Sequence, residues 1–319
     1  MKKPLRLKTI VDILLSPLTF LSAILLSNIR KIGLHKMPVS RGIFRLVGVL
    51  PVRDHYYEPL FNPRHLRNPL SEDRNLPGID MNAREQLEIL GEFDFNDELL
   101  AIPAEKKGDL EFYYHNLNFQ PGDAEYLYKM VRFFKPGKIV EIGCGHSTLM
   151  ISEALRQNRK ADGGYACEHI CIEPYEIPWL EKLDVKLIRE KVELVDKHVF
   201  RELNQNDILF IDSSHVIKPQ GDVLFEQFEI LPGLRSGVLV HIHDIFTPRD
   251  YLDKWVLDEV KLWNEQYLLE ALLMFNNEFK IIGALNYLKH NFWDEISAKC
   301  PILQREPYRE PCSFWIVKK

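Results

Sequence analysis

Residues 140–148 read Val-Glu-Ile-Gly-Cys-Gly-His-Ser-Thr, and they carry the strongest indication of the fold. The β-rich run Lys138–Ile142 ends just before its two glycines, and a helical pattern over Ser147–Arg156 follows them, with Ser147 as the expected N-cap. Gly143 and Gly145 let the backbone turn sharply and approach a ligand closely, because they carry no Cβ. The free N–H groups at the start of the helix would face that ligand. We therefore predict that this turn binds the polar end of a nucleoside-type cofactor.

On both sides of this turn, strand-like runs alternate with helical stretches such as Gly122–Phe134 and Gly221–Leu231. This alternation predicts an α/β fold with helices on both faces of a parallel sheet. A long amphipathic helix is expected over Tyr251–Phe275, and the last two runs suit an antiparallel pair at the sheet edge. We predict a doubly wound, mostly parallel, seven-stranded sheet. Its expected strands are Lys138–Ile142, His169–Glu173, Val185–Arg189, Asp207–Asp212, Val238–His243, Phe279–Leu285 and Cys312–Val317.

An acidic residue follows the second expected strand. Glu173 stands in the run Cys171-Ile172-Glu173-Pro174, and carboxylates at this position bind ribose hydroxyls in dinucleotide folds. The third glycine of the dinucleotide fingerprint would fall at position 148, where Thr148 stands instead. A cofactor without a pyrophosphate is therefore favoured.

These motifs together resemble the class I S-adenosylmethionine-dependent methyltransferases. The resemblance rests on "VEIGCGHST", "IEP", "ILFIDSSH" and "GVLVHIHDIFTPRDY", and it covers roughly residues 120–285. It implies a Rossmann-like methyltransferase fold with S-adenosylmethionine as the cofactor, and it places the region 190–192 near the adenine. The cofactor-binding residues that the resemblance implies are Glu141, Gly143, Gly145 and Ser147 at the methionine end, Glu173 at the ribose, and Asp212 with Ser213 after the fourth strand.

Histidines and acids follow the fourth and fifth expected strands. Open α/β sheets place their sites at the carboxyl ends of strands, so the methyl acceptor is expected there. The acceptor must lie in line with the methyl group and, if it is a hydroxyl, must lose a proton. We expect His215 as the first candidate for the general base and His243 as the second, with Asp212 as a further catalytic residue. His241 is expected to be a structural strand histidine.

A metal ion is an open alternative for the same edge of the sheet. Asp212 and Asp244 occupy positions where some relatives bind Mg²⁺, which orients and acidifies a substrate hydroxyl. Those relatives often show two adjacent acids after the fifth strand, whereas this chain has His243 before Asp244. The odd count of five cysteines indicates a reducing compartment, and Cys167 and Cys171 are expected to be buried strand residues rather than zinc ligands.

The N-terminal region differs from the rest in charge. The net charge is −5, yet residues 1–54 carry ten Lys/Arg and only two acids. Within this basic head, residues 13–29 are free of charge, although Pro17 interrupts them. We favour a helix lying in a membrane surface. A helix packed on the protein's own body, a membrane span and a signal segment remain open.

We divide the chain into a basic apolar head (1–50), an irregular strap or substrate lid (51–109) and an S-adenosylmethionine-binding methyltransferase domain (110–319). The expected function is O-methylation of a sugar, a lipid-linked intermediate or a small metabolite, in the cytoplasm or at the cytoplasmic face of a membrane. One alternative is a metal-dependent hydroxylase, or another reaction on the same scaffold. The other is a non-catalytic module of a membrane-bound biosynthetic complex. An acidic balance argues against a nucleic-acid partner.

Overall fold

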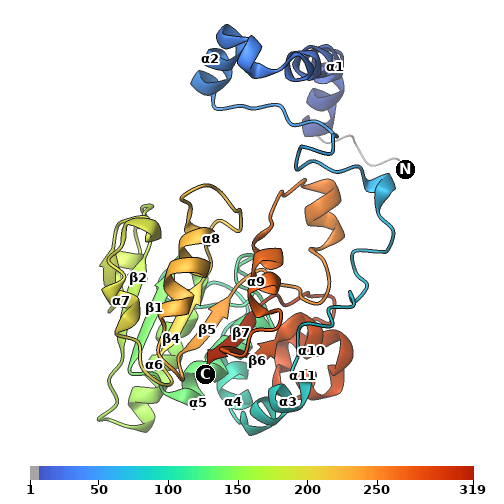
Figure 1. Cartoon of the computed structure of the whole chain (residues 1–319). Coiled ribbons are helices and arrows are strands. Elements are labelled where there is room, and N and C mark those ends of the chain that lie inside the picture. The colour runs from blue at the N-terminus through green and yellow to red at the C-terminus, as the bar shows by residue number, and fades with distance from the viewer. Residues whose placement is uncertain (1–6) are drawn as a thin grey trace. The chain divides into compact units, whose positions relative to one another are not determined.

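The computed structural model describes residues 7–319. The chain divides into two compact units, and their boundary in the sequence lies between Pro69 and Leu70. The N-terminal unit contains α1 (Leu7–Ile32), a 3₁₀ turn (Leu34–Lys36) and α2 (Pro38–Val47). Irregular chain follows, with a short 3₁₀ turn over Pro63–His65. The predicted head is thus helical, and the helix extends beyond the charge-free run at both ends (Figure 1).

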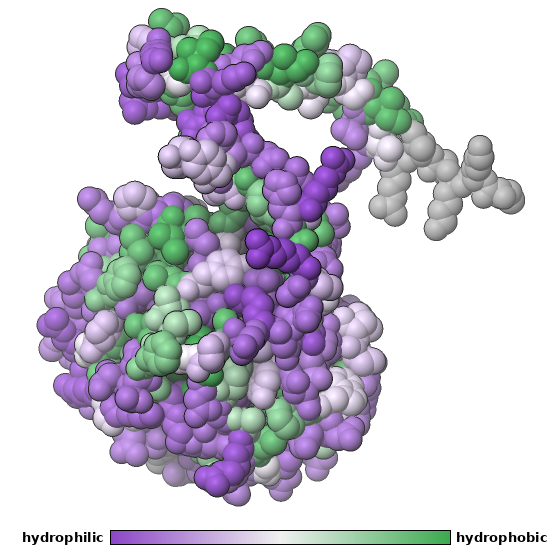
Figure 2. All heavy atoms as spheres, turned by 45° about the vertical axis from the view of Figure 1, so that its right-hand side comes forward, coloured by the Kyte–Doolittle hydropathy of each residue, from purple (hydrophilic) through white to green (hydrophobic). Residues whose placement is uncertain are grey.

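Helix α1 continues through Pro17, and a neighbouring side chain replaces the backbone hydrogen bond that Pro17 cannot donate. Proline has no N–H, so the carbonyl of Ile13 loses its usual partner one turn ahead. The Ser16 hydroxyl donates to that carbonyl at 2.8 Å. By length and composition this 26-residue helix, which includes an 18-residue window with a mean hydropathy of 2.1, could cross a membrane. None of its residues is buried, and Figure 2 shows hydrophobic side chains gathered along the N-terminal unit.

The C-terminal unit is built on one seven-stranded sheet with the order β3-β2-β1-β4-β5-β7-β6. The first five strands along the chain are parallel, whereas β7 runs antiparallel to both β5 and β6. The predicted mostly parallel, doubly wound sheet is confirmed, including the antiparallel pair at its edge. The strands are β1 (Lys138–Ile142), β2 (Glu168–Ile172), β3 (Lys186–Ile188), β4 (Ile208–Ile211), β5 (Leu239–Ile242), β6 (Phe279–Ala284) and β7 (Phe314–Lys318).

Helices cover both faces of this sheet (Figure 1). Their apolar faces pack on strands whose successive residues point to opposite sides. In β4, Ile208 and Phe210 belong to one hydrophobic cluster, and Leu209 and Ile211 belong to the other. The α-helices of this unit are α3 (Ala83–Glu92), α4 (Asn96–Ala101), α5 (Asp123–Phe134), α6 (His146–Ala161), α7 (His198–Arg201), α8 (Asp222–Phe225), α9 (Glu265–Leu273), α10 (Leu285–Asn291), α11 (Trp293–Lys299) and α12 (Pro301–Arg305).

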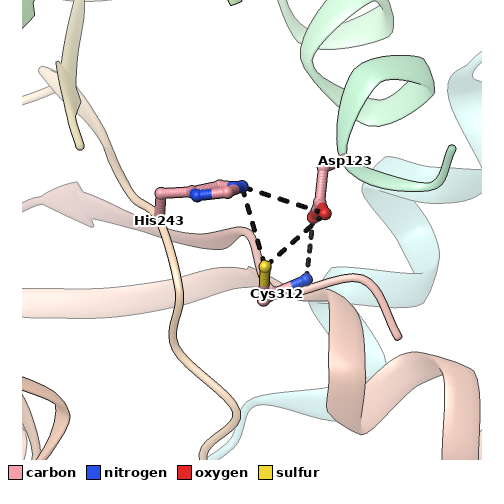
Figure 3. Close-up of side chains that lie close together, drawn as sticks. All are labelled: Asp123, His243 and Cys312. Carbon is pink, nitrogen blue, oxygen red and sulfur yellow. Dashed lines mark hydrogen bonds and ion pairs between the residues drawn. The ribbon is translucent and has the colours of Figure 1, made fainter. Parts of the chain in front are cut away.

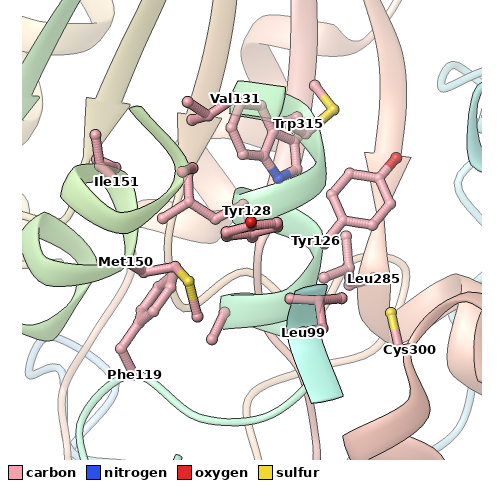
Figure 4. Close-up of a cluster of buried hydrophobic side chains, with 14 of the residues drawn as sticks. Leu99, Phe119, Tyr126, Tyr128, Val131, Met150, Ile151, Leu285, Cys300 and Trp315 are labelled. Carbon is pink, nitrogen blue, oxygen red and sulfur yellow. The ribbon is translucent and has the colours of Figure 1, made fainter. Parts of the chain in front are cut away.

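The larger cluster lies among α5, α6 and β7 (Figure 4). Tyr126 and Trp315 are fully buried in it, with ring centroids 6.3 Å apart. The Tyr126 hydroxyl donates to the carbonyl of Ile282 in β6, so the aromatic ring is buried with its polar tip satisfied. This packing fixes the start of α5 against the strand pair β6–β7, and the start of α5 borders the candidate site described below.

The predicted long helix over Tyr251–Phe275 is wrong. The region 251–264 contains only a π-helical turn (Lys254–Asp258), and α9 begins at Glu265. Aromatic packing overrides the amphipathic pattern, because the rings of Trp255 and Trp263 lie 5.1 Å apart and enclose the Lys261 ammonium. The predicted helix over Gly221–Leu231 is also interrupted, since α8 passes into a π-helical turn and then a 3₁₀ turn.

Strand register brings the site together. Ile142 in β1 pairs with Ile211 in β4, and Ile211 pairs with Ile242 in β5. The residues that come next, Gly143 and His243 among them, therefore emerge at the same edge of the sheet. The carboxyl ends of parallel strands are the usual place for a ligand in this architecture.

Candidate functional site

The glycine turn lies directly against the end of β4. Gly143 has a φ of +77°, a conformation that L side chains rarely adopt. A Cβ at this position would come within 1.9 Å of the backbone oxygen of Asp212. At Gly145 the backbone is extended and a Cβ would meet nothing within 4 Å. Gly143 is therefore required by the fold itself, whereas the space beside Gly145 is open to a ligand.

Glu141 and Ser147 support this turn from inside the protein. Helix α6 begins at His146, so the prediction of Ser147 as the N-cap is wrong. The Ser147 hydroxyl, at 2.7 Å, and the Thr148 hydroxyl, at 3.0 Å, both donate to one oxygen of the Glu141 carboxylate. The other oxygen lies 2.8 Å from Nε2 of His169. In this structure Glu141 and Ser147 hold the turn in place, and their predicted contact with the cofactor remains a prediction.

His169 carries the positive charge that balances Glu141. Burial lowers the pKa of this imidazole, but hydrogen bonds and charge from Cys171 and Glu141 outweigh it and raise the pKa to about 10. His169 and Glu141 are both buried, and such a pair is costly to break because either charge alone would be left without a partner. The network links β1, β2 and α6 behind the cofactor turn.

Glu173 connects the glycine turn to the turn after β2. One of its oxygens accepts the N–H of Cys144 at 3.2 Å, and the other accepts the N–H of Tyr175 at 2.8 Å. The side chain is 8% exposed and stands at the carboxyl end of β2. This is the position predicted for the ribose contact. Two backbone donors orient the carboxylate and leave further lone pairs for a ligand.

His215 is enclosed by three carboxylates. Its Nε2 lies 3.2 Å from Asp212 and 3.3 Å from Asp244, and its Nδ1 lies 2.9 Å from Glu265. Burial lowers the pKa of this histidine, but these acids raise it well above the usual value. An imidazolium held at both nitrogens cannot accept a proton from a substrate, so this geometry does not favour His215 as the general base.

Asp212 and Ser213 follow β4, where they were predicted to bind the cofactor. The Ser213 hydroxyl donates to Glu226 at 3.0 Å, and the contacts of both residues with the cofactor remain predictions. The pKa of Asp212 is lowered to about 2; burial opposes this shift, but His243 and His215 outweigh it. The Asp212 side chain is 34% exposed, so an ionised carboxylate is accessible at this edge of the sheet.

The residues predicted for Mg²⁺ do not fit that ion in this arrangement. Mg²⁺ requires near-octahedral oxygen ligands at about 2.0–2.1 Å. Here Asp212 and Asp244 face each other across Nε2 of His215, which takes the position between the two carboxylates. The imidazolium supplies the positive charge that a metal would bring, and Mg²⁺ is not assigned a role.

A second group of side chains, which the sequence did not single out as a unit, lies next to these acids. Asp123 at the start of α5, His243 after β5 and Cys312 before β7 point toward one another (Figure 3). The Cys312 sulfur lies 3.6 Å from Asp123 Oδ2 and 3.6 Å from His243 Nε2. Neither Asp123 nor Cys312 belongs to a recognisable sequence motif. Each follows a proline-containing turn that is far from the glycine motif in the sequence. Only the pairing of β7 with β5 brings Cys312 here.

A cavity of about 460 Å³ opens over this group. Its lining includes three of the predicted site residues, namely Asp212, His243 and Asp244, but not His215. A larger hollow of about 960 Å³ lies by α4 and α6, and its lining contains none of the clustered groups. His241 also lies away from the cavity, where its ring stacks on Phe210 at 4.0 Å. The full lining is Leu117, Asn118, Gln120, Pro121, Asp123, Asp212, His243, Asp244, Leu252, Lys254, Trp255, Lys261, Tyr308, Arg309, Glu310 and Cys312.

Comparison with known proteins gives a family for the central part of the chain. Residues 140–245 match the family described as a methyltransferase domain. An uncharacterized protein of Archaeoglobus fulgidus is 29% identical over 185 residues, which are 53% of this chain and 80% of the relative. The matched family segment includes the glycine turn, Glu173, Asp212 and His243.

Two solved structures show weaker similarity. An O-methyltransferase of Bacillus cereus in complex with SAH has a TM-score of 0.34 at 14% identity, covering 74% of this chain and 91% of that one. A putative protein-L-isoaspartate O-methyltransferase of Plasmodium falciparum has a TM-score of 0.25 at 14% identity, covering 37% and 56%. At these TM-scores neither similarity bears on the function of this chain. The family match over residues 140–245, together with the sheet order and the glycine turn between β1 and α6, supports a class I S-adenosylmethionine-dependent methyltransferase domain in this part of the chain.

Proposed function

We propose that the chain transfers the methyl group to a hydroxyl of an acceptor bound in the 460 Å³ cavity. The observation that carries this proposal is the direct contact between the two halves of the site, in which the Gly143 backbone lies against that of Asp212. A cofactor over the glycine turn would therefore border the wall of the acceptor cavity. The acceptor would be a sugar, a lipid-linked intermediate or a small metabolite.

Asp212 is the residue that we propose to contact the acceptor hydroxyl. Its carboxylate is accessible in the cavity and stays ionised, since its pKa is about 2. A carboxylate of low pKa is a weak base, but a hydroxyl becomes a strong acid as its oxygen bonds to the methyl carbon. The C–S bond breaks as the C–O bond forms, S-adenosylhomocysteine leaves, and the proton passes to Asp212. Methyl transfer then depends mainly on positioning.

His215 is proposed as a positioning residue. Its imidazolium contacts Asp212 and Asp244 through one nitrogen and Glu265 through the other. It would keep both cavity carboxylates ionised and fixed in direction. His243, the second predicted base, lines the cavity floor beside Asp212, with its Nδ1 3.7 Å from that carboxylate.

The proposal is tested with labelled S-adenosylmethionine and fractionated cell extract. A labelled product whose methyl group resists mild acid and lies on oxygen is the expected result. Asp212→Asn should then lower turnover by about 10²–10³-fold, the usual range for loss of a proton acceptor, while S-adenosylmethionine affinity changes by no more than a few-fold. Ser214→Ala is the control, because Ser214 bonds to Asp222 and does not line the cavity. A product methylated on nitrogen, carbon or sulfur would contradict the proposal.

We also propose that α1 attaches the chain to a membrane surface. Lys8, Asp12, Ser16, Thr19 and Arg30 recur at spacings that place them on one face of the helix, whereas most of the remaining surface is apolar and exposed. The polar residues off this face, such as Asn28 and Lys31, lie mainly near the end of the helix. A narrow polar stripe on a long apolar helix suits a position in the plane of the interface. The finding that supports the proposal is the absence of any buried residue along the described helix. Attachment at the cytoplasmic face would give the methyltransferase unit access to its cofactor.

A further inference from the structure

Asp123, His243 and Cys312 form a compact group at the floor of the acceptor cavity. They come from three distant segments, and all three are buried. Each offers a different donor atom, namely a carboxylate oxygen, an imidazole nitrogen and a thiol sulfur. Proteins use this mixture of donors for divalent transition ions, whereas Mg²⁺ and Ca²⁺ are bound by oxygen.

Two of the three distances within this group match those of a tetrahedral site, and the third is slightly longer. Cys312 Sγ lies 3.6 Å from His243 Nε2 and 3.6 Å from Asp123 Oδ2, and Nε2 and Oδ2 are 3.9 Å apart. Zinc bonds of about 2.3 Å to sulfur and about 2.0–2.1 Å to nitrogen and oxygen imply separations of about 3.3–3.6 Å between ligand atoms. The three donors therefore surround a point that an ion of this size can reach with small side-chain shifts.

Asp123 is oriented for this task by the backbone. Its Oδ1 accepts the N–H of Cys312 at 2.9 Å and that of Ser313 at 2.7 Å, which leaves Oδ2 directed at the thiol. Metal ligands in proteins are commonly held by such outer hydrogen bonds. The two backbone donors also explain why Asp123 and Cys312 face each other across the start of β7.

Within the described chain, the polar groups nearest to the two His243 nitrogens are a thiol and carboxylate oxygens at 3.3 Å or more. Only 6% of the surface of this residue is exposed. Among the described residues, the contacts of its Nε2 are the thiol of Cys312 at 3.6 Å and the Asp123 oxygen at 3.9 Å (Figure 3). Its Nδ1 lies 3.3 Å from Asp244, which suits the outer partner of a ligating histidine. A buried polar ring aimed at two further donors points to a ligand between them.

The charge of the cavity floor favours a cation. Three buried or half-buried carboxylates, those of Asp123, Asp212 and Asp244, lie within 4 Å of the His243 nitrogens. The positive charge of His215 is shared with a further carboxylate, that of Glu265. Taking several carboxylates out of water is expensive unless positive charge compensates them. His215 compensates Asp212 and Asp244, and a divalent ion at the centre of the Asp123 group would compensate Asp123.

We propose that Asp123, His243 and Cys312 bind one divalent transition ion of the Zn²⁺ type. Three protein ligands leave the fourth position of a tetrahedral ion facing the cavity, which is the arrangement of catalytic rather than structural zinc sites. The site differs in its donor atoms from the Asp212 and Asp244 pair considered for Mg²⁺, since two of its three donors are nitrogen and sulfur. It adjoins that pair, because the Cys312 thiol also donates to Asp244 at 3.2 Å. The inference goes beyond the proposed function, because ion binding requires neither cofactor nor acceptor.

The experiment uses the full chain, stripped with a chelator and titrated with CoCl₂ in the absence of cofactor. Cobalt reports its own ligands, since a bound thiolate gives a charge-transfer band in the near ultraviolet and tetrahedral geometry gives strong visible bands. One equivalent should bind with both signals, and ZnCl₂ but not MgCl₂ should displace it. Cys312→Ser should abolish the charge-transfer band, and Asp123→Asn should weaken binding at least 10-fold. Cys300→Ser is the matched control, because Cys300 is equally buried but lies in the hydrophobic core.

If Cys312→Ser does not fold, variants at the other cysteines test the proposal. A variant that keeps Cys312 as its only cysteine should retain the band, and a variant that lacks only Cys171 should retain it too. Far-ultraviolet circular dichroism and S-adenosylmethionine binding check that each variant is folded. Folded wild-type protein that binds no cobalt would overturn the proposal. A band that persists in folded Cys312→Ser protein would also overturn it, and its loss in Cys171→Ser protein would place the ion at Glu141, Cys144 and Cys171 instead.

Discussion

The two halves of the site are built in opposite ways. The cofactor half is local in sequence, because the turn after β1, the start of α6 and the end of β2 are joined by contacts such as Glu141 with Ser147 and Cys144 with Glu173. The acceptor half gathers Asp123, Asp212 and Cys312 from segments that lie up to 189 residues apart. The first half can be recognised from a motif, whereas the second exists only once the sheet has formed.

The halves also differ in charge. In the cofactor half, the buried carboxylate of Glu141 is matched by the imidazolium of His169. In the acceptor half, carboxylates outnumber the histidines that face them, as His215 alone contacts three acids. A balanced network stabilises a fixed turn, while an excess of acid leaves a cavity that attracts a cation or a hydrogen-bond donor. The difference matches the two tasks of holding a cofactor and activating an acceptor.

The largest effect is expected where the halves touch. Gly143→Val would place a branched side chain against the backbone of Asp212 at a φ of +77°, so neither strand end could keep its position. We expect loss of the folded state, seen as insoluble protein or a collapsed melting transition, together with loss of cofactor binding. Gly145→Ala is the control, since a Cβ there meets nothing within 4 Å. Gly145→Ala should fold normally and bind S-adenosylmethionine more weakly. A stable, cofactor-binding Gly143→Val protein would show that the two halves are not in contact.

The next effect concerns charge balance behind the cofactor turn. The pKa of His169 is raised to about 10, so the pair with Glu141 stabilises the fold fully below the unfolded value of about 6.5 and ceases to do so as pH rises through about 10. His169→Gln should therefore cost about 3–5 kcal/mol of stability at pH 6, the usual cost of breaking a buried pair. Denaturant unfolding at pH 6 and at pH 10.5 measures it, and the difference from wild type should shrink at the higher pH.

A double variant sharpens this test. Glu141→Gln combined with His169→Gln removes both buried charges, and it should recover part of the stability that His169→Gln loses. If the two single changes and the double change were simply additive, the residues would not act as a pair. Equal losses at pH 6 and pH 10.5 would show that His169 contributes by packing rather than by charge.

A smaller effect is expected at the ribose position. Glu173→Ala removes an acceptor that the cofactor would use, at a cost of about 1–3 kcal/mol in S-adenosylmethionine affinity, or about 5–150-fold in Kd. Part of this loss would come from the turn, because Glu173 also accepts the N–H of Cys144. Calorimetric titration gives the value, with the exposed Glu176→Ala as the control. Unchanged affinity would assign Glu173 to the turn alone.

The contrast between the two halves also explains which parts of the fold and of the site could be predicted from the sequence. The strand–glycine–helix pattern and the alternation of strands predicted the sheet, and they placed Gly143, Glu173 and Asp212 at one edge of it. They did not bring Asp123 and Cys312 together with His243, because those contacts depend on β7 running between β5 and β6. Residue type alone favoured His215 as a base, whereas its surroundings of three acids could be seen only in the fold. The helix over Tyr251–Phe275 failed for a different reason, since packing of Trp255 on Phe246 and Trp263, which are close in sequence, replaced it.

The smallest effect on either half is expected from removing the N-terminal unit. Deleting residues 1–69 leaves the unit that begins at Leu70 and contains the whole sheet, so S-adenosylmethionine affinity should change by less than about two-fold. Membrane attachment should change instead, because α1 and α2 carry the exposed apolar surface and several basic residues. Each basic residue near an anionic surface contributes about 1 kcal/mol, and salt weakens that share. The full chain should therefore sediment with phosphatidylserine-containing vesicles less completely at high salt, and the deletion variant should remain in the supernatant. Sedimentation of the deletion variant would locate the attachment in the methyltransferase unit, and release of the full chain only by detergent would show that α1 spans the membrane.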